Sequence, residues 1–419
     1  MCVKGSKYAF FLMLLVSGVS SCTKDFDLNV GNGVGDAIIT MTLTPPDYGV
    51  TLGLLGTGTV NIDWGDGKIE KHTLVPYIEN TGCVIDINSD KSLFRHDYSG
   101  SSTCTIRIEG EDITFLNCSS IQLTSLDVKN AIKLTSLYCT HNQLTSLDVS
   151  NNVALTNFSC IYNQLTSLDV NNNVALKELD CFENQLTSLN VSKNLELTRL
   201  DCSKNQLKSL DVSNNTALLY LNCFNNQIRS LDVSKNTALV NLQCSENSLT
   251  SLDVRNNTML HTLRCGENKL SCLDVSKNTA LIELWCSNNQ ITNLDVSKIS
   301  MLKWFYCSYN QLSGLDVSNN EKLFYLFCNN NKITSLDVKN NPNLSILNCN
   351  VNQLKSLDVS NNTGLSGFHC HSNQITSLDV RNLTGLVLLD FSNNQLTSLD
   401  VSNNTQLSVL YCSDNSLTK

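Results

Sequence analysis

A column of cysteines recurs every 21 residues from Cys118 to the end of the chain, and Phe391 occupies the one position that departs from it. Clustered thiolates bind zinc or exchange disulfides. A zinc site needs ligands that converge on one point, usually from close pairs, and the sequence contains no Cys-x-x-Cys. Because an apolar Phe391 replaces one member, we interpret the column as small buried hydrophobes with free thiols. The column comprises Cys118, Cys139, Cys160, Cys181, Cys202, Cys223, Cys244, Cys265, Cys286, Cys307, Cys328, Cys349, Cys370 and Cys412.

A second column, with the same spacing, is acidic and is interrupted by Asn190. Carboxylates stacked one repeat apart repel each other, and calcium bound to their oxygens would relieve that repulsion. The alternative is that each carboxylate accepts hydrogen bonds from nearby backbone N–H groups or hydroxyls, which Asn190 can also do without charge. We favour this second interpretation. The column comprises Asp127, Asp148, Asp169, Asp211, Asp232, Asp253, Asp274, Asp295, Asp316, Asp337, Asp358, Asp379 and Asp400.

Other catalytic or ligand-binding motifs do not stand out in the sequence. His369 and His371 lie two residues apart and could hold a metal with a third ligand, but an exposed polar role is commoner. No nucleophile elbow, zinc-binding helix motif or phosphate-binding loop occurs, so we predict neither an enzyme nor a cofactor. The 38 acidic against 29 basic residues, with no long basic run, argue against nucleic acid as a partner.

The cysteine and aspartate columns belong to a two-part repeat, for which residues 197–218 serve as the type unit. Each half places apolar residues two apart at its centre, which is the period of a β-strand, and an Asn three residues later, where the chain must turn. We expect Asn205 to bind backbone groups at the first turn. The side chains expected to point inward and to stack on neighbouring coils are Leu197, Leu200, Cys202, Leu207, Leu210 and Val212.

The segment Leu197-x-x-Leu200-x-Cys202-x-x-Asn205-x-Leu207 resembles the highly conserved segment of leucine-rich repeats, and the whole unit resembles the bacterial IRREKO class. The resemblance covers residues 113–419. It implies a mainly β fold: a right-handed solenoid of about 15 coils with little or no helix, a parallel sheet on one face, and strands or extended turns on the other. It also implies that the residues flanking the central Leu, here Arg199 and Asp201, face solvent.

Three consecutive coils carry aromatic residues in these solvent-facing columns, where most other coils carry Ser, Asn, Asp or Glu. Strands about 4.8 Å apart would bring the rings into one surface, extended by Ile282 and Ile346. We predict that this surface binds a protein. The alternatives are a carbohydrate ligand stacked on the rings, or mutual stacking for stability alone. The aromatic patch is defined as Trp285, Trp304, Tyr306, Tyr309, Phe324, Tyr325 and Phe327.

The N-terminus has the pattern of an export signal. Lysines precede an apolar run at 8–16 that is too short to span a bilayer, so we assign residues 1–21 to a signal peptide. Val19-Ser20-Ser21-Cys22 resembles a bacterial lipobox, which implies lipidation of Cys22. The segment 23–27 resembles the acidic surface-export signal of Gram-negative lipoproteins. These resemblances predict a lipid-anchored protein of the outer membrane, exposed at the cell surface, with residues 22–35 as a tether.

Residues 36–110 show short alternating runs, at 37–43, 59–64 and 104–108, that predict a small β-sandwich ahead of the repeat array at 111–419. The motif at 63–67, Asp-Trp-Gly-Asp-Gly, together with Tyr98, resembles PKD-type immunoglobulin-like domains. The resemblance implies a surface interaction module or a spacer. Cys83 and Cys104 could form a disulfide in an oxidising compartment.

The last coil contains Cys412 and ends after its first half. No polar unit follows to cover its apolar face, although repeat arrays normally have one. We therefore expect its inward-facing residues, Leu407, Leu410, Cys412 and Leu417, to be partly uncovered.

Overall fold

The computed structural model describes residues 37–76, 92–100 and 102–418, which belong to one compact unit. The predicted signal peptide, lipidation site Cys22 and tether lie outside these residues, as does Cys83. The described residues form strands and turns without helix, as the sequence predicts. No segment among them is a helix with the length and apolar character needed to cross a bilayer.

The strands fall into a longer N-terminal group and a series of very short strands spaced one repeat apart. The first group comprises β1 (Ala37–Leu43), β2 (Val50–Asp63), β3 (Ile69–Thr73), β4 (Leu93–His96), β5 (Cys104–Asn117) and β6 (Leu123–Asp127). The series comprises β7 (Ser136–Tyr138), β8 (Asn157–Ser159), β9 (Glu178–Asp180), β10 (Arg199–Asp201), β11 (Tyr220–Asn222), β12 (Asn241–Gln243), β13 (Thr262–Arg264), β14 (Glu283–Trp285), β15 (Trp304–Tyr306), β17 (Tyr325–Phe327), β19 (Ile346–Asn348), β20 (Gly367–His369), β21 (Leu388–Asp390) and β22 (Val409–Tyr411). Two further strands, β16 (Leu315–Asp316) and β18 (Leu336–Asp337), pair with each other.

Strand β5 joins the N-terminal strands to the solenoid. Its first half pairs antiparallel with β1, and most of its length pairs antiparallel with β2. Its last residues, Phe115–Asn117, pair parallel with β7 and so form the first strand of the solenoid sheet. The predicted boundary between residues 110 and 111 thus lies inside one continuous strand. The buried apolar residues of both parts form a single cluster that runs from Ala37 to Leu396.

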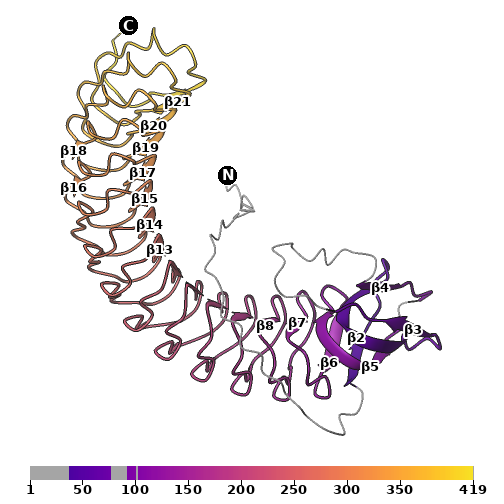
Figure 1. Ribbon diagram of the computed structural model, residues 1–419. Coiled ribbons are helices and arrows are strands. Elements are labelled where there is room, and N and C mark those ends of the chain that lie inside the picture. The colour runs from indigo at the N-terminus through magenta and orange to yellow at the C-terminus, as the bar shows by residue number, and fades with distance from the viewer. Residues whose placement is uncertain (1–36, 77–91, 101, 419) are drawn as a thin grey trace. The chain divides into compact units, whose positions relative to one another are not determined.

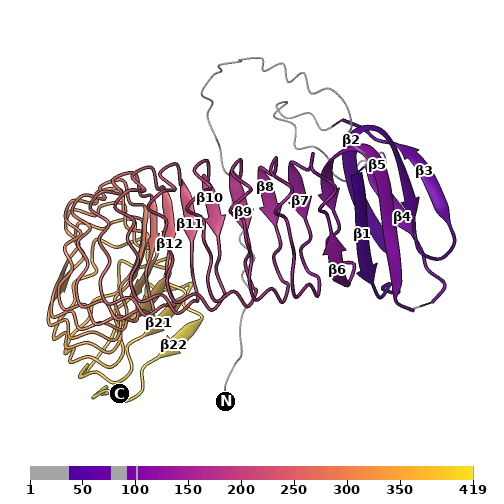
Figure 2. The same cartoon turned by 90° about the horizontal axis from the view of Figure 1, so that it is seen from below.

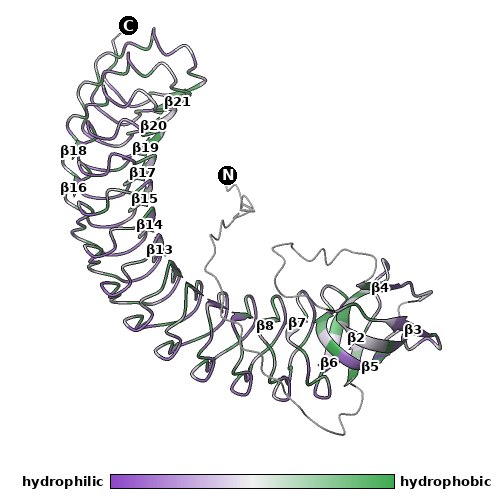
Figure 3. Cartoon of the chain, in the orientation of Figure 1, coloured by the Kyte–Doolittle hydropathy of each residue, from purple (hydrophilic) through white to green (hydrophobic). Residues whose placement is uncertain are grey.

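From β5 onward the chain forms a solenoid in which each short strand pairs in parallel with the strand one coil later. In Figure 2 the strands β7–β12 lie side by side like rungs, and in Figure 1 the short strands line the inner side of the bend. The central residue of each strand points into the coil. Apolar and polar positions therefore alternate along every coil, as the colouring of Figure 3 shows.

The interior of the coil matches the prediction. In the type unit, Leu197, Leu200, Cys202 and Leu207 are fully buried, and Leu210 is nearly so. Phe391 is buried in the cysteine column, which confirms that this position takes an apolar side chain. Each buried Leu stabilises the fold by roughly 1.5–3 kcal/mol. In the last coil Leu410, Cys412 and Leu417 are exposed and Leu407 is partly buried, as the sequence predicts.

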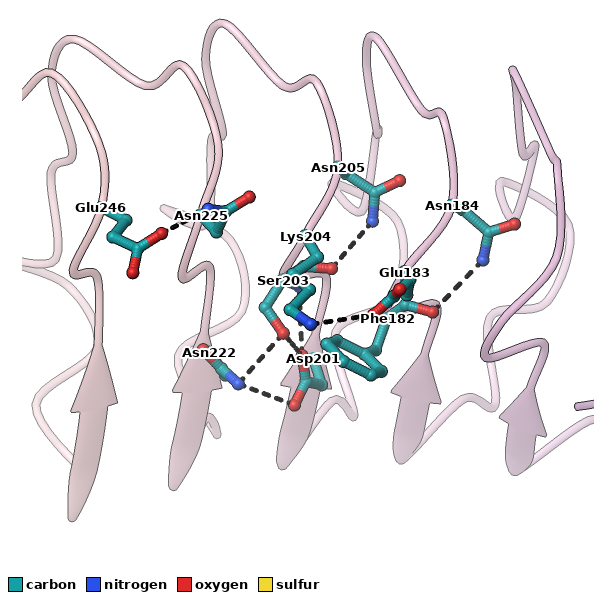
Figure 4. Close-up of polar contacts among 10 residues, drawn as sticks. All are labelled: Phe182, Glu183, Asn184, Asp201, Ser203, Lys204, Asn205, Asn222, Asn225 and Glu246. Carbon is teal, nitrogen blue, oxygen red and sulfur yellow. Dashed lines mark hydrogen bonds and ion pairs between the residues drawn. The ribbon is translucent and has the colours of Figure 1, made fainter. Parts of the chain in front are cut away.

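Buried asparagines close the first turn of each coil. The Asn205 amide donates to the carbonyl oxygen of Cys202, at 3.2 Å, and to that of Cys181 in the preceding coil, at 3.0 Å. Its Oδ1 accepts the Leu186 N–H, at 2.9 Å. Asn184 bonds in the same way one coil earlier. Figure 4 shows a further bond of each amide, from Asn184 to the Phe182 carbonyl oxygen and from Asn205 to the Ser203 carbonyl oxygen. The predicted role of Asn205 is confirmed, and each asparagine also connects two coils.

Aspartates and a second set of asparagines shape the other arc. Asp211 Oδ1 accepts the N–H of Ser213, at 2.9 Å, and Asn190 accepts the N–H of Ser192 in the equivalent position. Fully buried Asn215 donates to the carbonyl oxygens of Val191 and Asn194 in the preceding coil. Local hydrogen bonding therefore explains the acidic column, as favoured from the sequence.

Candidate binding surface

The aromatic patch lies on strands β14, β15 and β17 and the turns beside them. The central residues of these strands, Leu284, Phe305 and Leu326, are fully buried and anchor the backbone. Because successive side chains of a strand point to opposite faces, the residues on either side of each central residue point outward. The parallel register places Trp285 beside Tyr306, and Tyr306 beside Phe327. The coil geometry thus gathers the predicted residues on one face.

One half of the patch is a continuous stack of rings. The Trp285 and Tyr306 rings stack with centroids 5.1 Å apart, and the Tyr306 and Phe327 rings with centroids 5.0 Å apart. Arg264 caps the stack, with its guanidinium 5.6 Å from the Trp285 ring centroid, and forms an ion pair with Glu283 at 2.8 Å. Burial, followed by the nearby Glu283 charge, raises the pKa of Tyr306, so its hydroxyl stays neutral. This stack stabilises the packing of the adjacent strands β14, β15 and β17.

Four members of the patch are exposed, one of which, Trp285, also belongs to the stack. The exposed fractions are 39% for Trp285, 37% for Trp304, 42% for Phe324 and 54% for Tyr309. Trp304 and Tyr309 make no ring contact within the described part of the chain, and Phe324 contacts only the neighbouring Tyr325, with centroids 4.7 Å apart. Trp304 and Tyr309 therefore expose apolar surface to water that no other described ring covers.

The structure corrects the prediction for Asp201, which was expected to face solvent. Asp201 is buried, with an exposed fraction of 7%. Its carboxylate accepts hydrogen bonds from the Ser203 N–H at 3.1 Å and from the Asn222 amide of the next coil at 2.9 Å, and these neighbours close over it (Figure 4). Arg199, the other predicted outward residue, is partly covered because its guanidinium lies 4.0 Å from the Tyr220 ring centroid.

A second, smaller aromatic group lies on the early coils, and its connections were not apparent from the sequence. The rings of His141 and Tyr162 stack with centroids 4.4 Å apart, and Phe182 meets Tyr162 edge to face at 5.1 Å. The ammonium group of Lys204 lies 5.1 Å from the Phe182 ring and bonds Glu183 (Figure 4). The spacings of 21 residues between His141 and Tyr162 and of 20 between Tyr162 and Phe182 were the available signal. Most of these rings contact one another or Lys204, so this group presents less exposed apolar surface than the aromatic patch.

The remaining chemical candidates have structural roles in this fold. Cys202 is fully buried, burial raises its pKa well above the ordinary range, and its thiol donates to the Asn222 carbonyl oxygen at 3.6 Å. His369 is half-buried, which lowers its pKa, and His371 bonds the Ser372 hydroxyl at 3.0 Å. Across the described ranges, no three His, Cys, Asp or Glu side chains are grouped to hold a metal ion.

The chain is similar to solved leucine-rich repeat structures. InlJ of Listeria monocytogenes, whose functional domain includes a cysteine ladder, is 36% identical over 74% of this chain and 67% of its own, with a TM-score of 0.65. The internalin InlF of the same species is 25% identical over 71% of this chain and 86% of its own, with a TM-score of 0.59. A leucine-rich repeat protein of Leptospira interrogans, 22% identical over 72% of this chain and 90% of its own, shares the fold with a TM-score of 0.64. No family model and no curated protein matches the sequence.

Proposed function

The chain belongs to the leucine-rich repeat proteins, and we propose that it is a non-enzymatic scaffold that binds a protein partner through the aromatic patch. The observation that carries the proposal is the exposure of four large aromatic side chains on three consecutive coils. Exposed apolar clusters of this kind are typical of interaction sites, and Trp and Tyr are the residues that most often anchor them. A rigid parallel sheet beneath the rings favours binding because little ordering is needed when the partner docks.

The backbone at Tyr309 gives a means to separate binding from stability. Tyr309 has a φ of 55°, in the left-handed region, where a bulky side chain is strained and Asn is tolerated better. The same position is occupied by Asn in neighbouring coils, at Asn288 and Asn330. If Tyr309 served stability alone, an Asn would suit its backbone better. Tyr309→Asn therefore removes an exposed ring of the aromatic patch without adding backbone strain.

The test compares the full-length wild type with two substitutions, Trp304→Ala and Tyr309→Asn. Each protein is immobilised and exposed in parallel to a surface-protein extract and to a glycan array. Captured proteins are identified, purified and titrated by calorimetry. We expect one protein ligand whose affinity falls by about tenfold or more with each substitution, since aromatic anchors commonly contribute 2 kcal/mol or more.

Tyr162→Asn is the matched control, because Tyr162 occupies the same column as Tyr309 with a φ of 52° but lies far from the aromatic patch in the sequence. It should leave binding unchanged. Thermal unfolding should show Tyr309→Asn to be at least as stable as the wild type. Unchanged affinity after both patch substitutions would refute the proposed site, and binding to glycans without a protein ligand would favour the carbohydrate alternative.

We further propose, from the sequence resemblance alone, that the protein is lipidated at Cys22 and anchored to the outer membrane with the solenoid displayed at the cell surface. The N-terminal strands would then act as a spacer or a second interaction module. Metabolic labelling with a fatty acid should mark the wild type but not Cys22→Ala. Equal labelling of the two proteins would eliminate this anchor, and protection from protease added to intact cells would contradict surface display.

A further inference from the structure

A pocket of about 360 Å³ lies at one border of the aromatic patch, at the N-terminal ends of β15 and β17. It is formed between consecutive coils, because Lys303 immediately precedes β15, Trp304 begins that strand, and Phe324 immediately precedes β17. The backbone N–H of Phe324 bonds the Lys303 carbonyl oxygen at 2.8 Å and fixes the two coils at this point. The lining residues are Lys303, Trp304, Lys322, Phe324 and Asn343.

The charge of this pocket is positive and uncompensated. Its lining contains two lysines and no acidic residue, in a chain whose net charge is −9. Among the described residues neither lysine forms an ion pair; the ammonium group of Lys322 contacts only the Met301 sulfur, at 2.9 Å. Arg264, the cation that caps the aromatic stack, is already neutralised by Glu283. Glu321 precedes Lys322 in the chain but does not line the pocket.

The hydrogen-bonding groups of the pocket are mainly donors. Lysine ammonium and the tryptophan indole N–H can donate but cannot accept. Neither Lys303 nor the Trp304 indole N–H has a side-chain hydrogen bond among the described residues, and the Asn343 amide donates to the Glu321 carbonyl oxygen at 3.0 Å. The exposed rings of Trp304 and Phe324 form the apolar walls. A complementary ligand therefore offers anionic acceptor oxygens beside apolar groups.

We propose that this pocket recognises an acidic segment of the protein partner, in which an Asp or Glu carboxylate lies next to a bulky apolar side chain. The inference rests on the proposed function, because it specifies the chemistry of the partner that the aromatic patch binds. The carboxylate lies between the ammonium groups of Lys303 and Lys322, and the apolar side chain packs on Trp304 and Phe324. The remaining rings of the patch, Trp285 and Tyr309 among them, contact the flanking residues of the segment.

The test uses immobilised synthetic peptides as probes. One set places Asp or Glu beside Phe or Leu, a second replaces each acid by Asn or Gln, and a third replaces it by Lys. Glycans that carry sialic or uronic acids serve as a further probe, since they offer carboxylates without a polypeptide. Binding of the full-length protein is measured by biolayer interferometry at low and high salt. We expect only the acidic apolar peptides to bind, and more weakly as salt rises.

Charge reversal at the pocket provides the matched variants. Lys303→Glu and Lys322→Glu should each weaken binding of the acidic peptides by roughly fivefold. Lys177→Glu is the control, because Lys177 occupies the same column as Lys303 and is exposed but has no aromatic patch beside it. It should leave binding unchanged. All three substitutions are at exposed positions, so equal thermal unfolding temperatures can confirm that folding is retained.

The outcomes separate this inference from the proposed function. Loss of partner binding in Trp304→Ala, but not in either pocket lysine variant, would retain the aromatic patch and overturn the acidic-segment proposal. Equal binding of acidic and neutral peptides would overturn it as well, as would preferential binding of the acidic glycans. Unchanged partner binding in Trp304→Ala, Tyr309→Asn and both lysine variants would overturn the two proposals together.

Discussion

Asparagine is the residue that closes these coils and joins them to each other. A buried amide costs free energy unless its donor and acceptor groups are satisfied, and a leucine cannot supply the hydrogen bonds that a turn leaves open. Asn205 donates to carbonyl oxygens of two coils and accepts from a backbone N–H of the earlier one. The same side chain therefore fixes the turn within a coil and the spacing between coils.

Asn205→Ala should destabilise the protein by about 2–4 kcal/mol, because it leaves several buried backbone groups without partners. The measurement is the free energy of unfolding from urea titration. Asn214→Ala is the control: Asn214 is exposed and donates only to the Ser192 carbonyl oxygen at 3.1 Å, so a change below about 0.5 kcal/mol is expected. If both substitutions lowered the free energy of unfolding equally, burial of the amide would not explain the contribution of Asn205 to stability.

The paired carboxylates of Asp180 and Asp201 should make stability depend on pH. They occupy facing positions of β9 and β10. Burial, followed by the Asp201 charge, raises the pKa of Asp180 from 3.8 to about 7. Since the folded pKa exceeds the unfolded value, the contribution of protonated Asp180 is fully present below pH 3.8 and is lost as the pH rises through 7.

Asp180→Asn should therefore raise the free energy of unfolding above pH 7 by about 1–3 kcal/mol relative to the wild type. The difference between the two proteins should shrink toward pH 4, where the wild-type carboxyl is protonated in the folded state. Urea titrations across this pH range measure it. A difference that does not change with pH would mean that folding does not raise the pKa of Asp180.

The two arcs of each coil are built from different elements. On the inner face, three-residue strands pair in parallel across the whole array. On the opposite arc, β6 of the first coil pairs antiparallel with β1, β16 pairs with β18, and Asp169 forms an isolated bridge with Asn190, while the other described coils form no strand pairs. Asp turns and the second asparagine column replace strand pairing there. Strand β5, by contrast, is a single element that pairs both with the antiparallel N-terminal strands and with the solenoid sheet.

Asp211→Ala should lower the free energy of unfolding by about 0.5–1.5 kcal/mol, because the Ser213 N–H loses its acceptor. Asp211→Asn should be nearly neutral, because Asn190 makes the equivalent bond.

Hydrogen bonds from the Ser213 hydroxyl and N–H lower the pKa of Asp211. Its contribution is present above the unfolded pKa and is lost as the pH falls through the folded value. Thermal unfolding at neutral and acid pH measures both effects. A rise in melting temperature with added calcium would instead support an ion in the acidic column.

At the scale of the molecule, the solenoid is a one-dimensional stack. Each inner strand pairs only with the strands one coil before and one coil after it, as β10 does with β9 and β11. Stability in such an array is the sum of coil and nearest-neighbour contributions. The proposed binding surface occupies a few consecutive coils, and the other coils hold these in register.

Removal of residues 198–218, one complete coil, should leave a folded protein with cooperative unfolding and an intact aromatic patch. The new junction places Leu219 directly after Leu197, in the column that Thr198 occupied. Removal of residues 198–217 should prevent folding of the array, because a shift by one residue moves inward side chains to the outer face. Circular dichroism and urea titration measure both. Equal folding of the two deletions would contradict the stacked register.

The solenoid, its inward columns and the roles of Asn205 and Asp211 could all be predicted from the sequence. In a repeat, the neighbour of a residue in space is the residue 21 positions away, so burial and turn chemistry can be inferred from spacing alone. The aromatic patch could be located for the same reason. How those side chains lie across columns could not be predicted in this way. In the folded protein Trp285, Tyr306 and Phe327 stack while Trp304 makes no ring contact among the described residues. Ser203 and Asn222 bury Asp201, and Lys303 and Lys322 line one pocket. Periodicity specifies which residues are adjacent, but exposure and charge pairing depend on side-chain conformations and on contacts from both adjoining coils at once.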